Sequence, residues 1–129
     1  MERRRALLLL IASCSLAAEQ KRKAPPLQIE ILEAKAERSQ GKIMLDGQIR
    51  NSGSRTLQKL ILIFDLLDAD RKTISRRSGP IDDKILPPGE ESAFHFFIPD
   101  HARAVEINVR SEHAGLEITV VQPGPYPID

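Results

Sequence analysis

Several residue types are scarce in this 129-residue chain, and each shortage excludes a class of function. There is a single cysteine, so no disulfide can form within the chain. There is no tryptophan and only one tyrosine, which argues against a carbohydrate site built on stacked aromatic rings. The formal net charge is only +1, so the chain lacks the basic excess that nucleic-acid binding requires.

Long hydrophobic runs are also missing. The apolar segment at residues 6–12 is too short to cross a bilayer, since a spanning helix needs roughly 20 apolar residues. It follows three arginines and ends in Ile11-Ala12-Ser13-Cys14. This pattern resembles a bacterial lipoprotein signal peptide, which implies that Cys14 is acylated and becomes the mature N-terminus. The alternatives are a secretory signal cut after Ala17 or Ala18 and an uncleaved anchor.

The chain is expected to contain one folded domain. We predict a lipoprotein signal peptide at 1–13, a lipid-anchored tether at 14–26, a β-sandwich domain at 27–121 and a proline-rich tail at 122–129. Three arginines and one glutamate lie in 1–13, so 16 basic and 17 acidic residues would remain after cleavage. A mature chain of this size can bury a working core without disulfides or metal.

Beyond Pro26 the sequence shows short alternating apolar runs separated by turn residues, which is typical of strands. The expected strands are 27–38, 43–49, 57–67, 72–78, 94–98, 105–109 and 116–121. The first of these contains good helix formers, but its early alternation after a proline pair favours a strand. This spacing predicts an all-β sandwich. Three prolines in the tail should keep it out of any ladder.

Three motifs in this region resemble the FxLYD-type bacterial envelope domain. They are Gly47-Gln48-Ile49-Arg50-Asn51-Ser52-Gly53, Phe64-Asp65-Leu66-Leu67-Asp68, and Ile85-Leu86-Pro87-Pro88-Gly89-Glu90 followed by Phe94. Leu67 stands where tyrosine is usual. The resemblance covers residues 41–110 and implies an immunoglobulin-like antiparallel β-sandwich of about seven strands. That family has no established chemistry, so it supplies no catalytic positions.

The most apolar strand is expected to be hydrophobic on both faces. Leu60, Leu62, Phe64 and Leu66 fall on the face that should point into the core. The opposite face carries Ile61, Ile63 and Leu67, interrupted by Asp65. These three residues either form a candidate partner surface or are covered by the tether or tail.

No group of residues in the sequence predicts a metal or catalytic site. Asp65, Asp68 and Asp70 lack the glycine and the closing glutamate of an EF-hand loop. The histidines lie in separate segments without ligand spacing, and His95 is expected to face outward: His95, His101 and His113. No serine sits in a nucleophile-elbow motif. We therefore expect no cofactor, no metal and no enzymatic activity.

A basic group flanks the strand expected at 72–78: Arg71, Lys72, Arg76 and Arg77. Charges on an edge strand prevent edge-to-edge aggregation, which is the ordinary role of such a group. The alternative is contact with lipid phosphate or with an acidic partner.

These features predict a lipid-anchored, non-catalytic domain that serves protein interaction or assembly at the bacterial cell surface or periplasm. The membrane is expected to hold the lipid, and an envelope protein is the expected partner. Ser15, rather than aspartate, follows Cys14, which favours an outer membrane if the organism has one. The alternative is a soluble secreted β-sandwich that binds a small ligand or metal through a site not visible in the sequence.

Overall fold

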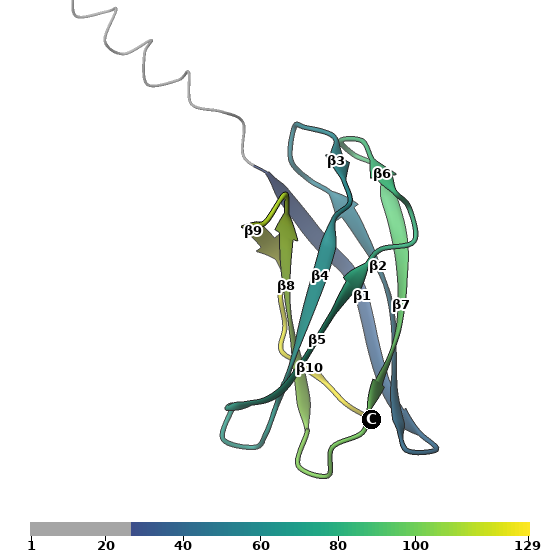
Figure 1. Cartoon of the computed structure of the whole chain (residues 1–129), viewed down its shortest axis with the longest axis vertical. Helices are drawn as coiled ribbons and strands as arrows, with labels where there is room; N and C mark the ends of the chain where they lie inside the picture. The colour runs from purple at the N-terminus through teal and green to yellow at the C-terminus, as the bar shows by residue number, and fades with distance from the viewer. Residues whose placement is uncertain (1–26) are drawn as a thin grey trace, which may run out of the picture.

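The computed structural model describes residues 27–129, which form ten β-strands and no helix (Figure 1). The expected all-β fold is confirmed. The seven strands of six or more residues are β1 (Gln28–Ser39), β2 (Lys42–Asn51), β4 (Ile61–Leu67), β5 (Thr73–Pro80), β7 (Glu91–Pro99), β8 (Glu106–His113) and β9 (Leu116–Val121). The two-residue strands are β3 (Leu57–Gln58), β6 (Ile85–Leu86) and β10 (Tyr126–Pro127). The predicted signal peptide, the tether and Cys14 lie outside the described residues.

The long strands form two layers that face each other, as in an immunoglobulin-like sandwich (Figure 1). Their hydrogen-bonded order is β5-β4-β8-β9-β1-β2-β7. The first four strands make one layer, and β1, β2 and β7 make the other. The polar segment expected at 72–78 is the edge strand β5 of the first layer, and β7 is the edge strand of the second.

One pairing differs from the antiparallel arrangement that we expected. Gln28–Glu30 of β1 pairs in parallel with Thr119–Val121 of β9, and this joins the two layers along one side. All the other strand pairs are antiparallel. Alternating apolar residues indicate which segments form strands. They do not indicate which strands become neighbours or whether neighbouring strands run in the same direction.

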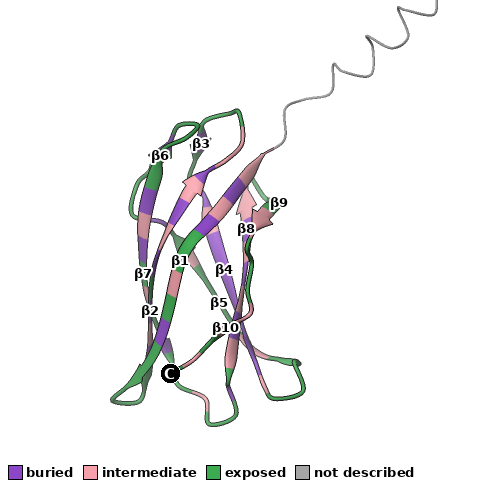
Figure 2. Cartoon of the chain, turned by 180° about the vertical axis from the view of Figure 1, so that it is seen from behind, coloured by how far each residue is buried: buried purple, intermediate pink, exposed green. Residues whose placement is uncertain are grey.

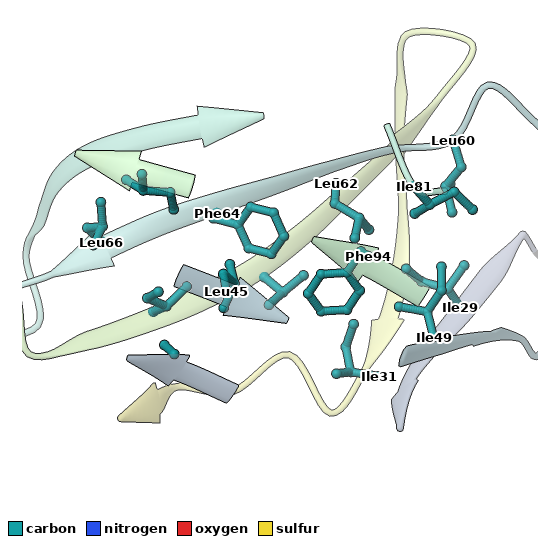
Figure 3. Close-up of a cluster of buried hydrophobic side chains, with 14 of the residues drawn as sticks. Ile29, Ile31, Leu45, Ile49, Leu60, Leu62, Phe64, Leu66, Ile81 and Phe94 are labelled. Carbon is teal, nitrogen blue, oxygen red and sulfur yellow. The ribbon is translucent and has the colours of Figure 1, made fainter. Parts of the chain in front are cut away.

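The core lies between the layers and includes the strand face that the sequence predicts (Figures 2 and 3). Leu60, Leu62, Phe64 and Leu66 are all buried. The ring of Phe64 packs against that of Phe94 from the opposite layer, with 5.7 Å between ring centroids. Such close packing of aromatic rings adds to the free energy that burial alone supplies.

Gly47 in the first motif has a packing role. A Cβ atom at this position would overlap the carbonyl oxygen of Glu33 and the ring of Phe94. The β1–β2 register shifts between Ile31 and Glu33, so β1 approaches β2 closely at this point. Glycine is therefore required here by close approach rather than by a turn.

Asn51, at the end of the same motif, connects three chain segments. Its buried side-chain amide donates to the carbonyl oxygens of Arg55 and Leu86 at 2.8 Å each, and its Oδ1 accepts from the Gly53 amide at 3.0 Å. Its backbone carbonyl accepts from the amide of Gly89. That glycine has a φ of +82° in the predicted Pro87–Glu90 turn, which is closed by a hydrogen bond from Glu90 to Pro87.

The expectation that the tail stays out of the ladder is wrong. Tyr126 and Pro127 pair with β8, and Ile128 forms a parallel bridge with Ala36 of β1. The amide of Asp129 donates to the carbonyl of Ala36. The prolines at 123 and 125 break the strand after β9, but the residues that follow Pro125 include free amides that can resume pairing.

We predict that Asn51→Ala lowers the free energy of unfolding by about 2–4 kcal/mol, because it removes three hydrogen bonds and leaves the Leu86 carbonyl without its donor. Urea unfolding measures this loss. The control is Asn108→Ala on the half-exposed outer side of β8, where we expect a change within about 0.5 kcal/mol. Equal losses in both variants would contradict the role given to Asn51.

Candidate functional site

The three residues of the candidate partner surface do not form an exposed apolar face. Ile63 and Leu67 are only 6% and 4% exposed, whereas Ile61 is half-buried. Ile63 lies between Ser78 and Arg110 of the neighbouring strands. Of the three, Ile61 alone is accessible enough to meet a partner.

The centre of this outer face is polar. Asp65 is buried and receives one arginine from each neighbouring strand. The Nε atoms of Arg76 on β5 and Arg110 on β8 both lie 2.7 Å from its carboxylate oxygens. Arg110 also lies 3.9 Å from Glu117 on β9. These contacts join the four strands of the layer through their side chains.

The environment of Asp65 keeps its carboxyl ionised. Burial alone would raise its pKa, but hydrogen bonds from Arg110 and Arg76 outweigh burial and hold the pKa below the usual 3.8. A carboxylate with a lowered pKa is a poor proton donor or acceptor near neutral pH. The arrangement therefore suits structural cross-linking of strands better than acid–base chemistry.

A mostly apolar groove of about 590 Å³ lies at the end of the sandwich that carries β3 and β6. It is lined by Gln58, Lys59, Leu60, Ile61, Pro80, Ile81, Asp83, Lys84 and Ile85. Leu60 and Ile81 are buried, whereas Ile85 is 57% exposed. Binding sites for small molecules and peptides have this size and this mixture of apolar lining with a few polar groups.

Backbone contacts hold the two sides of the groove together. The amide of Lys59 donates to the carbonyl of Lys84 at 3.2 Å, next to the short β3–β6 pair. Lys59 has a φ of +55°, a conformation that few non-glycine residues adopt. The same end of the sandwich holds the start of β1, because Gln28 accepts hydrogen bonds from the amides of Ser52 and Gly53 (Figure 1).

His95 faces outward from β7, as expected. Its Nδ1 atom lies 2.7 Å from Asp46 of β2, and its Nε2 atom lies 3.4 Å from Asp82. The hydrogen bond to Asp46 is the main cause of a raised pKa for this imidazole, and the charge of Asp82 adds to it. His101 and His113 lie elsewhere, on the β7–β8 loop and at the end of β8.

Within residues 27–129, no three histidine, cysteine or acidic side chains gather in a way that could hold a metal ion. Asp68 instead accepts hydrogen bonds from the backbone amides of Asp70 and Lys72, which is a turn contact. The same residues contain no helix long and apolar enough to cross a membrane.

Two of these features were not predicted from the sequence. The contact of Asp65 with two arginines had a faint signal, namely a lone carboxylate in an apolar strand with arginines in other strands. The sequence held no signal for the groove. Its walls come from residues 58–61 and 80–85, two segments that are brought together only when the chain folds.

Comparison with protein families gives a match to a family described as a protein of unknown function, DUF2393, over residues 5–114. The chain belongs to the DUF2393 family. The match starts within the segment interpreted as an export signal and extends to the end of β8. No curated protein matches this DUF2393 chain.

Several solved structures match this chain at low structural similarity. IrmA from Escherichia coli is 10% identical with a TM-score of 0.45, and the match covers 73% of this chain and 83% of IrmA. β-Glucuronidase 2 from Bacteroides uniformis is 14% identical with a TM-score of 0.47, and the match covers 73% of this chain but 12% of the enzyme. The GH20 exo-β-N-acetylglucosaminidase from Vibrio harveyi is 13% identical with a TM-score of 0.38, with 81% and 19% covered. Similarity this low carries no argument about function.

We predict that Asp65→Ala lowers the free energy of unfolding by about 1–3 kcal/mol at pH 7, because two arginines lose their shared carboxylate while remaining partly in water. Since the pKa of Asp65 is lowered by folding, its contribution is present above the unfolded value of 3.8 and is lost as pH falls through the folded value. Urea unfolding at pH 7 and at acid pH tests both points. Asp70→Ala in the exposed β4–β5 turn is the control, and a difference from wild type that persists in acid would contradict the assignment.

We predict that the pKa of His95 lies above 6.5 and that Asp46→Asn moves it down towards that value. Because folding raises this pKa, the contribution to stability is present below pH 6.5 and is lost as pH rises through the folded pKa. An NMR titration of the three histidines measures the change directly. An unaltered His95 pKa in the Asp46→Asn protein would show that this pair does not form.

Proposed function

We propose that this DUF2393 protein is a lipid-anchored, non-catalytic module of the bacterial envelope that binds a partner protein through the groove beside β3 and β6. The acyl chains on Cys14 would keep the domain at the membrane, because several acyl chains bind a bilayer far more firmly than one. In this proposal the outer membrane is favoured, and the partner is another envelope protein.

The observation that carries the proposal is the position and character of the groove. It is lined mainly by apolar side chains, and Ile85 at its margin is 57% exposed, so the groove and its margin form a continuous apolar surface that a partner could cover. It lies at the end of the sandwich where β1 begins, so a chain anchored upstream of Leu27 would hold the groove close to the membrane. A partner that resides in the same membrane would meet it there.

Two further features agree with this function. The motifs at 47–53, 64–68 and 85–90 resemble those of the FxLYD-type envelope domain, and the structure assigns them packing roles, as at Gly47 and Asn51. The most deeply buried carboxylate of residues 27–129, that of Asp65, is neutralised by arginines and is poorly suited to catalysis. A non-catalytic role is therefore the simplest one for this surface.

The groove volume also supports a second candidate, a secreted domain that binds a small apolar ligand. About 590 Å³ falls within the range of small-molecule sites. The two candidates differ in whether Cys14 is modified, and in whether a protein or a small molecule occupies the groove.

We predict that the mature protein isolated from its native membrane begins at Cys14, carries acyl mass and partitions into detergent, and that Cys14→Ala abolishes all three properties. Intact mass and phase partitioning of both proteins provide the measurement. An unmodified wild-type protein cut after Ala17 or Ala18 would exclude the anchor and favour the secreted candidate.

Site-specific photocrosslinking tests the groove itself. A photoreactive residue at position 85 should give a defined protein adduct in intact cells, whereas one at Leu32, a similarly apolar and exposed residue on β1, should not. The substitution Ile61→Asp should remove the adduct at 85 without preventing membrane association. Equal adducts at 85 and 32, or none at 85, would argue against a partner in the groove.

A further inference from the structure

The two edge strands of the sheet leave an opening on one side of the sandwich. β5 and β7 are the terminal strands of the hydrogen-bonded order, so the far edge of each has no strand beside it within the described chain. The two strands contact each other at one end. There Gly79 of β5 lies against the ring of Phe96 of β7, and the amide of Asp82, just after β5, donates to the carbonyl of Ala93 of β7. Beyond that contact the two strands diverge (Figures 1 and 2).

A cavity of about 280 Å³ lies where the strands have diverged. It is lined by Gly41, Lys42, Arg77, Phe97, Ile98 and Pro99. Phe97 is 64% exposed, which is unusual for so large an apolar side chain, and the ammonium of Lys42 lies 5.8 Å from the centre of its ring. The opening thus combines an unpaired strand edge with an exposed aromatic ring.

The charged residues that line this opening are all basic. Two cations line it and no carboxylate does. Among residues 27–129, neither Lys42 nor Arg77 makes an ion pair, whereas Arg76 and Arg110 share Asp65 and Arg38 holds Asp100. A guanidinium has five donors in a planar fork that fits a carboxylate, so Arg77 is equipped for an acidic ligand.

The register of β5 shows where that ligand would meet Arg77. Arg77 is paired with Phe64, whose side chain points into the core, so Arg77 projects from the inner side of the edge strand into the opening. On β7, Phe96 and Ile98 are paired with the buried Leu45 and Ile43, which places them on the inner side and Phe97 on the outer side.

We propose that this opening binds an extended acidic segment of a partner protein, which adds as a strand to the free edge of β7 and places a carboxylate on Arg77. Strand addition supplies backbone hydrogen bonds, and alternate side chains supply specificity. Residues of the added strand opposite Phe96 and Ile98 would face Arg77 and should be acidic. Those opposite Phe97 would lie beside its ring and should be apolar.

This site is separate from the groove at β3 and β6, and the proposal holds whether or not Cys14 is acylated. The basic group at β5 can also prevent aggregation of the edge strand. The same positive charges repel the basic edge of a second copy and attract an acidic segment of a partner.

The probe is a capped peptide of alternating valine and glutamate, titrated into the full chain in detergent solution and followed by calorimetry and amide NMR. We expect saturable binding with shifts in residues 95–99, and at least about tenfold weaker binding to Arg77→Glu. The matched control Arg55→Glu, an exposed arginine in the β2–β3 loop, should bind like the wild type. A valine–lysine peptide should bind Arg77→Glu better than the wild type, and this charge exchange excludes simple misfolding of the variant.

Four results would overturn the proposal. The first is the absence of binding at millimolar peptide. The second is equal binding of a fully N-methylated peptide, which cannot donate backbone hydrogen bonds and would indicate attraction of any polyanion. The third is equal loss of binding in Arg55→Glu. The fourth is sedimentation of the unliganded chain as a dimer that Phe97→Asp dissociates, which would assign the edge to a second copy.

Discussion

One buried side-chain amide organises the end of the sandwich where β1 begins. Asn51 holds the turn after β2, the short strand β6 and the turn before β7 in a single set of hydrogen bonds. A ladder as short as β3–β6 has little stability of its own. The β3–β6 pair contributes Gln58 and Ile85 to the walls of the groove. The shape of the proposed partner site therefore depends on Asn51, which does not line it.

The features predicted correctly from the sequence are those encoded by local pattern. The continuous apolar run identified β4, and its inward face, ending at Leu66, followed because successive side chains of a strand point to opposite faces. Turn chemistry located Gly89, since the type II turn needs a residue that tolerates positive φ. The polar, arginine-rich segment was recognised as an edge strand because a central strand would have buried its charges.

The features missed depend on which strands become neighbours. Alternation places Asp65 on the outer face of β4, but only the β5-β4-β8 order brings Arg76 and Arg110 to it, and this network occupies the face proposed to meet a partner. The tail was misjudged for a similar reason. A proline excludes only its own amide from a ladder, and whether the next residues pair depends on the strand beside them, here β8 next to Tyr126.

The parallel pairing of β1 with β9, continued by the bridge from Ile128 to Ala36, has a mechanical consequence. β1 starts at one end of the sandwich, and Asp129 lies towards the other (Figure 1). A pulling force between Leu27 and Asp129 therefore slides β1 along its neighbour and stretches their hydrogen bonds together, instead of opening them one at a time. Strands loaded in shear resist force far better than strands that are unzipped. A domain built in this way stays folded under tension applied along its length, between the start of β1 and the C-terminal residue.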